Sequence, residues 1–246
     1  DPLSFDHSGP SFVEVLKQVE TPKRVAFSPD LSVVSMEKEI AEVCRGATKV
    51  FKDIGAELTD EIPDFGGVLE AFQTLRAVLF AVMMEPILEQ HRDSIAPEIV
   101  GNIERGLNIS PSQIFEAERI RIELFKRVLD FFETHDFLVC PAASIAPFPV
   151  DQRYITEIDG KPCETYIDWF SITFALTMTA CPTISVPCGF TSEGLPVGVQ
   201  IMGKPRGEAA LLQVAKQFEQ AIGISNQLPI TPKTNLGNNS EQKYQQ

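Results

Sequence analysis

The first third of the chain alternates short apolar runs with one long amphipathic stretch. Residues 24–27 (RVAF) form a β run that ends at a Ser-Pro-Asp turn, and a second short strand begins at Glu57. Between them, residues 36–54 place apolar side chains at helical spacing and stop before a glycine, which is typical of helix ends. The order strand, helix, strand predicts a βαβ unit in an α/β sheet.

The middle of the chain is dominated by helical patterns. Residues 64–90 predict a long helix, or two helices, with a break near Glu85-Pro86. Residues 111–134 predict another helix, with its apolar side chains on one face. The continuous apolar run 137–141 (FLVCP) is typical of a fully buried strand, and the Pro- and Asp-rich segment 144–160 predicts a long loop.

The last third returns to strands. Residues 166–180 are apolar on nearly all sides, so a helix there is expected to be deeply buried. Residues 183–187 (TISVP) and the alternating run 196–202 predict two strands of an antiparallel hairpin. Residues 207–222 predict a final amphipathic helix, and the polar, Gln/Asn-rich tail 231–246 is expected to be disordered.

Composition adds an acidic charge to this pattern. The 246 residues include 34 Asp and Glu against 21 Lys and Arg, which gives a net charge of −13. Such a chain repels phosphate backbones and anionic membranes, so we expect neither a nucleic-acid nor a membrane partner. The longest apolar run, around residues 77–84, is too short to span a bilayer, and no signal peptide is visible.

The five cysteines argue for a reducing compartment. Their number is odd, and no pair has the spacing of a disulfide framework or a zinc site. We therefore expect a cytoplasmic protein without a metal. Cys140 and Cys188 lie in apolar, strand-like runs and are expected to be buried.

Recognisable catalytic motifs are scarce. The sequence contains no GxSxG, HExxH or GxGxxG motif. The three histidines, His7, His91 and His135, have no serine or cysteine at motif spacing. No catalytic residue and no cofactor is therefore assigned from these patterns.

The most informative segment is 169–203, which reads WFSITFALTMTACPTISVPCGFTSEGLPVGVQIMG. Its part from Pro182 to Gly203 closely resembles the C-terminal motif of amidase-signature enzymes. The sequence GEAALL at 207–212 resembles the start of the family's final helix. Weaker resemblances are DPLS at 1–4 to its mid-chain linker and FLVCPA at 137–142 to its buried strand. The resemblance covers most of residues 1–225.

The resemblance implies a fold and a chemistry. Residues 1–230 would form the C-terminal half of an α/β/α sandwich with a central mixed β-sheet. Members of the family hydrolyse amides through an acyl-enzyme, using a Ser–cis-Ser–Lys triad and a Gly/Ser-rich run in their N-terminal half. No such run exists in this chain, so no catalytic residue is transferred. The implied partners are an N-terminal segment that carries the triad and a small-molecule amide substrate.

The resemblance also implies that this half supplies one wall of the substrate pocket, from the long helix and from the segment before the TISVP strand. We expect seven residues there: Leu75, Arg76, Phe80, Trp169, Phe170, Thr173 and Cys181. The aromatic residues could equally belong to the core. Arg76, among apolar neighbours, either pairs with a carboxylate that stabilises the fold or meets an acidic substrate, and the first interpretation is favoured.

Two departures from the family pattern bear on the substrate. Thr177 and Ala180 occupy places where the family often has Asn and Gly. The glutamyl-tRNA amidotransferase branch has an acidic residue near the position of Phe170, so an aromatic ring there favours a bulkier, apolar or aryl acyl group.

Three functions remain open from the sequence. The chain is an amidase half that works with its N-terminal segment, a non-catalytic scaffold or binding subunit, or an independent hydrolase with an unrecognised site. The strands at 183–187 and 196–202 carry few charges, so the chain alone is expected to expose an apolar edge and to self-associate, with a homodimer as one form.

Overall fold

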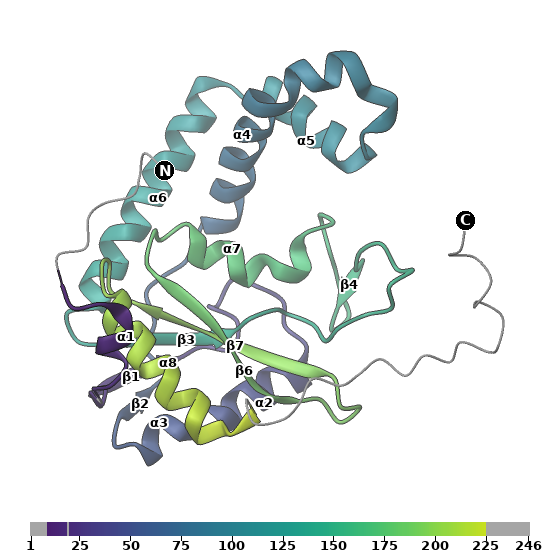
Figure 1. Cartoon of the computed structure of the whole chain (residues 1–246). Helices are drawn as coiled ribbons and strands as arrows, with labels where there is room; N and C mark the ends of the chain where they lie inside the picture. The colour runs from purple at the N-terminus through teal and green to yellow at the C-terminus, as the bar shows by residue number, and fades with distance from the viewer. Residues whose placement is uncertain (1–8, 19, 225–246) are drawn as a thin grey trace, which may run out of the picture.

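The computed structural model describes residues 9–18 and 20–224 and is built on a five-stranded mixed sheet in the order β2-β1-β3-β7-β6 (Figure 1). The strands are β1 (Arg24–Phe27), β2 (Glu57–Thr59), β3 (Phe137–Pro141), β6 (Thr183–Phe190) and β7 (Pro196–Gly203). β1 pairs in parallel with β2 and with β3, while β7 runs antiparallel to β3 and β6. The mixed sheet expected from the sequence is confirmed.

Helices cover both faces of this sheet. One face carries α1 (Phe12–Val15), α2 (Lys38–Ala47), α3 (Lys49–Asp53) and α8 (Glu208–Ile222). The other carries α4 (Val68–His91), α5 (Pro97–Leu107), α6 (Pro111–Phe131) and α7 (Ser171–Thr177). Two short 3-10 turns, η1 (Arg92–Ser94) and η2 (Asp168–Phe170), precede α5 and α7. A small hairpin joins β4 (Glu157–Ile158) to β5 (Lys161–Pro162).

The predicted βαβ unit is confirmed, but its helix is divided. The sequence predicted one helix over residues 36–54, whereas α2 ends at Ala47 and α3 begins at Lys49. Thr48, between them, donates its side-chain hydroxyl to the carbonyl of Arg45 at 2.8 Å. Such a local bond competes with the regular helical ladder and accounts for the break.

The expected break at Pro86 is wrong, because α4 continues through it to His91. A proline removes one backbone donor and leaves the carbonyl four residues earlier without its helical partner. That carbonyl belongs to Val82, which is exposed, so water can replace the missing bond. The sequence analysis also missed α5, although Pro97 at its first position and Glu98 in its first turn are typical start signals.

By length and composition alone, the stretch Val68–Ser94 is apolar enough to cross a membrane. The sequence analysis considered only the uninterrupted apolar run around residues 77–84 and did not find this longer stretch. The same test is passed by core helices of soluble proteins. In the structure this stretch packs against α5, α6 and α7, and 28% of its apolar window is buried.

The hairpin of β6 and β7 is confirmed and is longer than predicted. β6 continues to Phe190 because a bulge between Pro187 and Gly189 absorbs one extra residue in the pairing. The helix predicted over residues 166–180 is shorter, since α7 spans only Ser171–Thr177 after the turn η2. The expected disorder of residues 231–246 and the linker at 1–4 lie outside the described residues.

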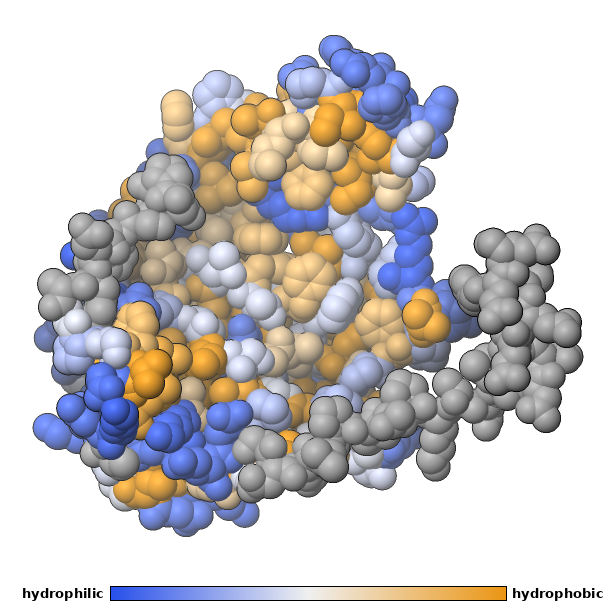
Figure 2. Space-filling model, viewed as in Figure 1, coloured by the Kyte–Doolittle hydropathy of each residue, from blue (hydrophilic) through white to orange (hydrophobic). Residues whose placement is uncertain are grey.

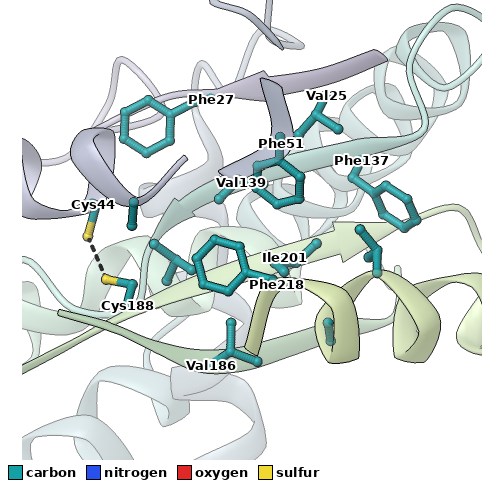
Figure 3. Close-up of a cluster of buried hydrophobic side chains, with 14 of the residues drawn as sticks. Val25, Phe27, Cys44, Phe51, Phe137, Val139, Val186, Cys188, Ile201 and Phe218 are labelled. Atoms are coloured by element: carbon teal, nitrogen blue, oxygen red, sulfur yellow. Dashed lines mark hydrogen bonds between the residues drawn. The ribbon is translucent and has the colours of Figure 1, made fainter. Parts of the chain in front are cut away.

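The strands bury alternate side chains in two separate cores. On the α2 and α8 face, Val25, Val139 and Ile201 pack with Phe51 and Phe218 (Figure 3). On the α4 and α6 face, the neighbouring strand residues form the second core: Ala26, Leu138, Cys140 and Met202. In the first core the Cys44 and Cys188 sulfurs lie 3.8 Å apart as free thiols, which brings α2 against β6.

Strands β2 and β6 are the two edges of the sheet, and β6 is the longer of them. Among the described residues, β6 pairs only with β7. Val186 and Cys188 are buried against the helices beneath, while Ser185 and Pro187 are exposed. Figure 2 shows apolar side chains on the upper helices and in the hollow between these helices and the sheet.

Candidate substrate cavity

Two adjoining cavities lie between α4, α5 and the segment that leads from β4 into α7. The larger has a volume of 540 Å³ and the smaller 330 Å³. They share five lining residues: Gln73, Arg105, Cys163, Glu164 and Thr165. Because α4, α5 and the β4–β5 hairpin converge here from separate parts of the chain, the two cavities together form a candidate site for a substrate.

Helix α5 packs closely on α4 beside the smaller cavity. A Cβ atom at Gly106 would lie 2.0 Å from the Ala77 carbonyl oxygen, so only glycine allows the two helices to approach this closely. Asn102, one helical turn before Gly106, therefore reaches across to the α4 side chains. The contact fixes which α5 residues face the cavity.

Arg76 is the centre of a polar network at the wall of the 330 Å³ cavity. One of its Nη atoms donates to Asn102 Oδ1 at 2.9 Å, and the other donates to the Tyr166 hydroxyl oxygen. Asn102 Nδ2 donates to the same hydroxyl oxygen at 2.9 Å and to the Glu98 carbonyl oxygen at 2.9 Å. The guanidinium carbon of Arg76 lies 4.7 Å from the Phe80 ring centroid, close enough for a cation–π contact.

The expectation that Arg76 pairs with a carboxylate is wrong for the part of the chain that the structure describes. Its partners there are an amide, a phenol and two aromatic rings, and no ion pair is formed. The neutral partners satisfy some of its donors, and its positive charge remains uncompensated at the cavity wall.

Other charges around the cavities are mixed. Glu98 is bound to Arg153, with 2.7 Å between its Oε2 and an Nη of the arginine. Asp168 accepts the backbone N–H groups of Glu164 and Thr165 at 2.7 and 2.9 Å. The side chains of Arg105 and Glu164 are exposed, and neither forms a hydrogen bond or ion pair with another described residue. Burial raises the pKa of the Cys163 thiol, so this residue remains protonated at neutral pH.

A series of aromatic rings forms the apolar side of the site. The rings of Phe72 and Phe174 stack in parallel, with 4.0 Å between their centroids. Phe170 meets Phe174 at 6.1 Å and Trp169 at 4.8 Å, both edge to face. Of this series, Phe174 also lines the 540 Å³ cavity.

Two hydrogen bonds hold the start of α7 against the end of β3. Thr173 donates its hydroxyl to the Ala142 carbonyl at 2.9 Å. The backbone N–H of Ser144 donates to the Trp169 carbonyl at 3.0 Å. Because β3 is fully buried, these bonds fix the aromatic segment relative to the rigid centre of the sheet.

The segment between α7 and β6 contains Ala180, which stands where the family often has glycine. Ala180 has a φ of 54°, in the left-handed region that glycine adopts without strain. An L-residue there costs roughly 1 kcal/mol. Cys181, next in the chain, is half-buried, its thiol donates to the Thr179 carbonyl at 3.6 Å, and burial raises its pKa.

The structure therefore separates the seven residues predicted for the pocket wall. Arg76 lines the smaller cavity, and Phe80 lies against its guanidinium. Trp169, Phe170 and Thr173 belong to the aromatic segment beside the larger cavity but do not line it. Leu75 and Cys181 pack, partly buried, against the α4 and α6 core. The assignment of these seven to a substrate pocket stays a prediction.

The residues of the smaller cavity that were not anticipated include Asn102, Arg105 and Tyr166. The first two lie on the missed helix α5, and Tyr166 was assigned to a helix that in the structure begins only at Ser171. Start signals at Pro97 would have placed Asn102 and Arg105 on a helix, but not against Arg76.

Two other arrangements resemble catalytic pairs. Thr59 Oγ1 lies 3.0 Å from His135 Nε2, but neither residue lines the cavities described above, and the imidazole is buried and stacked on Phe131. Ser35 and Lys38 have S-x-x-K spacing, which the motif analysis passed over. Lys38 is exposed and lies 3.7 Å from Glu42, and no hydrogen bond joins it to Ser35 in the described structure.

The relatives of this chain include acylamidases, amidases and glutamyl-tRNA(Gln) amidotransferase subunits A, one of which, from Alkaliphilus metalliredigens, is 25% identical over 78% of this chain and 43% of the relative. A family model described as Amidase matches residues 2–212. The acylamidase of Rhodococcus erythropolis is 29% identical over 222 residues, which cover 89% of this chain and 46% of the relative. The amidase of Pseudomonas putida is 25% identical over 229 residues, which cover 90% of this chain and 47% of the relative.

Solved structures share the fold. A bacterial aryl acylamidase of the amidase signature family superimposes with a TM-score of 0.79 at 23% identity, over 94% of this chain and 51% of that one. A 6-aminohexanoate cyclic dimer hydrolase superimposes with a TM-score of 0.77 at 19% identity, over 91% and 50%. The chain spans about half the length of the relatives it matches along most of its own length.

Proposed function

Because the chain belongs to the amidase family, we propose that it acts as the C-terminal half of an amide hydrolase whose nucleophile and base come from an N-terminal segment. The observation that carries this is the family match over residues 2–212 in a chain half as long as its relatives. In addition, no hydrogen bond joins a serine to a lysine within residues 9–18 and 20–224.

In this proposal the chemistry follows the family's triad. The outer serine attacks the amide carbonyl and loses its proton, through the middle serine and the lysine, to the leaving amine. Water then hydrolyses the acyl-enzyme and regenerates the serine. The present chain holds the substrate beside the cavities and the aromatic series, and it supplies no atom to bond making or breaking.

The open edge of β6 supports a place for the N-terminal segment. Residues Thr183–Phe190 contain no charged side chain, and unpaired edges of this kind normally carry charges or are covered. We propose that the segment covers this edge in the intact protein. A cytoplasmic location fits the five free cysteines and remains part of the proposal.

The aromatic series supports an apolar or aryl acyl group. Trp169, Phe170 and Phe174 present a continuous set of rings beside the larger cavity, and a flat aromatic acyl group could stack against such rings. The resemblance of the fold to an aryl acylamidase is compatible with this preference.

The test compares the intact protein with residues 1–246 alone. Ammonia release from benzamide and from acetamide is measured for both. We expect hydrolysis only by the intact protein, with a higher kcat/KM for benzamide. Hydrolysis by residues 1–246 alone would establish an independent site, and an intact protein inert toward both amides would favour a scaffold. A clear preference for acetamide would contradict the aryl acyl group alone.

A further inference from the structure

The hydrogen-bond directions around Tyr166 leave its hydroxyl proton without an acceptor among the described residues. Its oxygen accepts one bond from Arg76 and one from Asn102 Nδ2. The orientation of the Asn102 amide is fixed, because a flipped amide would place its NH₂ against the Arg76 donor and its oxygen against the Glu98 carbonyl. With both neighbours donating, the Tyr166 O–H can only act as a donor to something else.

Arg76 strengthens the donor character of the same wall. A guanidinium has five N–H donors, and two of its nitrogens are committed to Asn102 and Tyr166. Its charge is half-buried between the rings of Phe80 and Tyr166, where the screening by water is weaker than on an open surface. An uncompensated cation and an unused phenolic donor therefore border one cavity of 330 Å³.

Arg105 adds a second, adaptable positive charge. Its side chain lines both cavities and bonds to no described residue. Two acidic residues line the smaller cavity: Glu98 is neutralised by Arg153, whereas Glu164 is exposed and unpaired among the described residues. The adjoining cavity adds Asp168, which accepts two backbone N–H groups, and the exposed Glu70. The wall of the 330 Å³ cavity itself thus offers two arginines and one phenol against a single uncommitted carboxylate.

We propose that this wall binds the carboxylate of an amide substrate that carries an acidic group apart from the scissile bond. Arg76 and the Tyr166 hydroxyl donate to the carboxylate oxygens, and Arg105 closes over it from α5. A carboxylate fits because it is a charged, acceptor-only group that arginine recognises in two-pronged geometry. That the ligand is an amide rests on the proposed function; that it is an anion rests on the donors alone.

The test measures binding to the intact protein with two benzamides of matched shape. 4-Carboxybenzamide carries the anion, and 4-nitrobenzamide replaces it with a planar neutral group of similar size. Calorimetric Kd values at pH 7 should be about tenfold to a hundredfold lower for 4-carboxybenzamide, as expected for hydrogen bonds to a charged group. Equal affinities would overturn the proposal.

The variants separate recognition from folding. Arg76→Gln should abolish the preference, but it also removes hydrogen bonds within the fold. Arg105→Gln touches no bonded partner and should reduce the preference about threefold. Glu164→Gln should increase it by a similar factor, because a repelling charge is removed, and a gain of affinity cannot arise from misfolding. Arg119→Gln, in an exposed ion pair on α6, is the control and should change nothing.

Binding and hydrolysis then report on different claims. A preference for 4-carboxybenzamide that depends on Arg105 and Glu164 supports the carboxylate site even if neither benzamide is hydrolysed, in which case only the proposed function fails. Hydrolysis of 4-nitrobenzamide with no binding preference for the anion supports the hydrolase and overturns the carboxylate site. A preference that survives both arginine substitutions would also overturn it.

Discussion

Strands β3 and β6 are alike in sequence and different in surroundings. Both are apolar and uncharged, reading FLVCP and TISVPCGF. All five residues of β3 are buried, because β1 and β7 flank it and helices cover both faces. β6 has one neighbouring strand among the described residues and exposes alternate side chains. An apolar, uncharged strand sequence therefore shows that the strand can be buried, but it does not indicate how many other strands pair with it.

The two faces of β6 differ in burial. Val186 and Cys188 pack on α2 and α8, and Ile184 on the same face is half-buried. Ser185 and Pro187 point to the other face and remain exposed, next to an unpaired edge. A strand without charges at such an edge is a site for pairing with another chain segment. This agrees with the proposal that an N-terminal segment covers β6.

The largest expected effect lies in β3. Leu138→Ala removes a fully buried side chain from the α4 and α6 core and should lower the free energy of unfolding by about 2–5 kcal/mol. Ile184→Ala in β6, which is half-buried, should lower it by about 1 kcal/mol in residues 1–246. Urea unfolding followed by circular dichroism measures both.

The comparison sharpens in the intact protein. If a further segment covers β6 there, the cost of Ile184→Ala should rise toward that of Leu138→Ala, while the cost of Leu138→Ala stays the same. An Ile184→Ala cost that does not differ between residues 1–246 and the intact protein would mean that β6 remains an open edge.

The same contrast shows what the sequence could predict. Short apolar runs, one alternating run and helical spacing identified all five strands of the main sheet and most helices, because the burial of each element is written in its own local pattern. The patterns missed α5 and the division at Thr48, where close helix packing and a local side-chain bond decide the outcome. They also placed a break at Pro86, since they could not tell that the exposed side of α4 would tolerate it.

The cavity was less predictable than the fold. Arg76 could be singled out as a charge among apolar residues, but its partners Asn102 and Tyr166 are 26 and 90 positions away and meet it only through the packing of α5 and the β4–α7 segment. Nothing in the local sequence of Tyr166 indicates that its proton lacks an acceptor. That property follows from the hydrogen-bond directions of three residues together.

A smaller effect should appear in the pH dependence of stability. Burial raises the pKa of the Cys140 thiol in β3, so the folded chain keeps a proton that the unfolded chain releases above about pH 8.5. Stability is therefore unaffected below that pH and falls above it, with a slope that approaches about 1.4 kcal/mol per pH unit for this thiol. Cys140→Ala should remove that part of the slope in urea unfolding between about pH 7.5 and 9.5.

The matched variant is Cys181→Ala, just before β6. Burial also raises the pKa of Cys181, but its side chain is only half-buried, so its loss should change the slope less than the loss of Cys140 does. Equal changes of the slope for the two variants would contradict the expectation that a thiol in the fully buried strand β3 contributes more than a half-buried thiol before β6.

The smallest expected effect on stability, well below about 1 kcal/mol, comes from a charge on the exposed side of β6. Ser185→Lys should change unfolding little, since the side chain is exposed, but it should reduce self-association of residues 1–246, because a lysine on an edge strand opposes pairing between edges. Sedimentation velocity measures the association, with Gln18→Lys, exposed after α1, as the control of equal charge change. If residues 1–246 are monomeric before any substitution, the edge of β6 is not adhesive and the expected self-association is wrong. If both lysine variants reduce association equally, net charge rather than the β6 edge governs it.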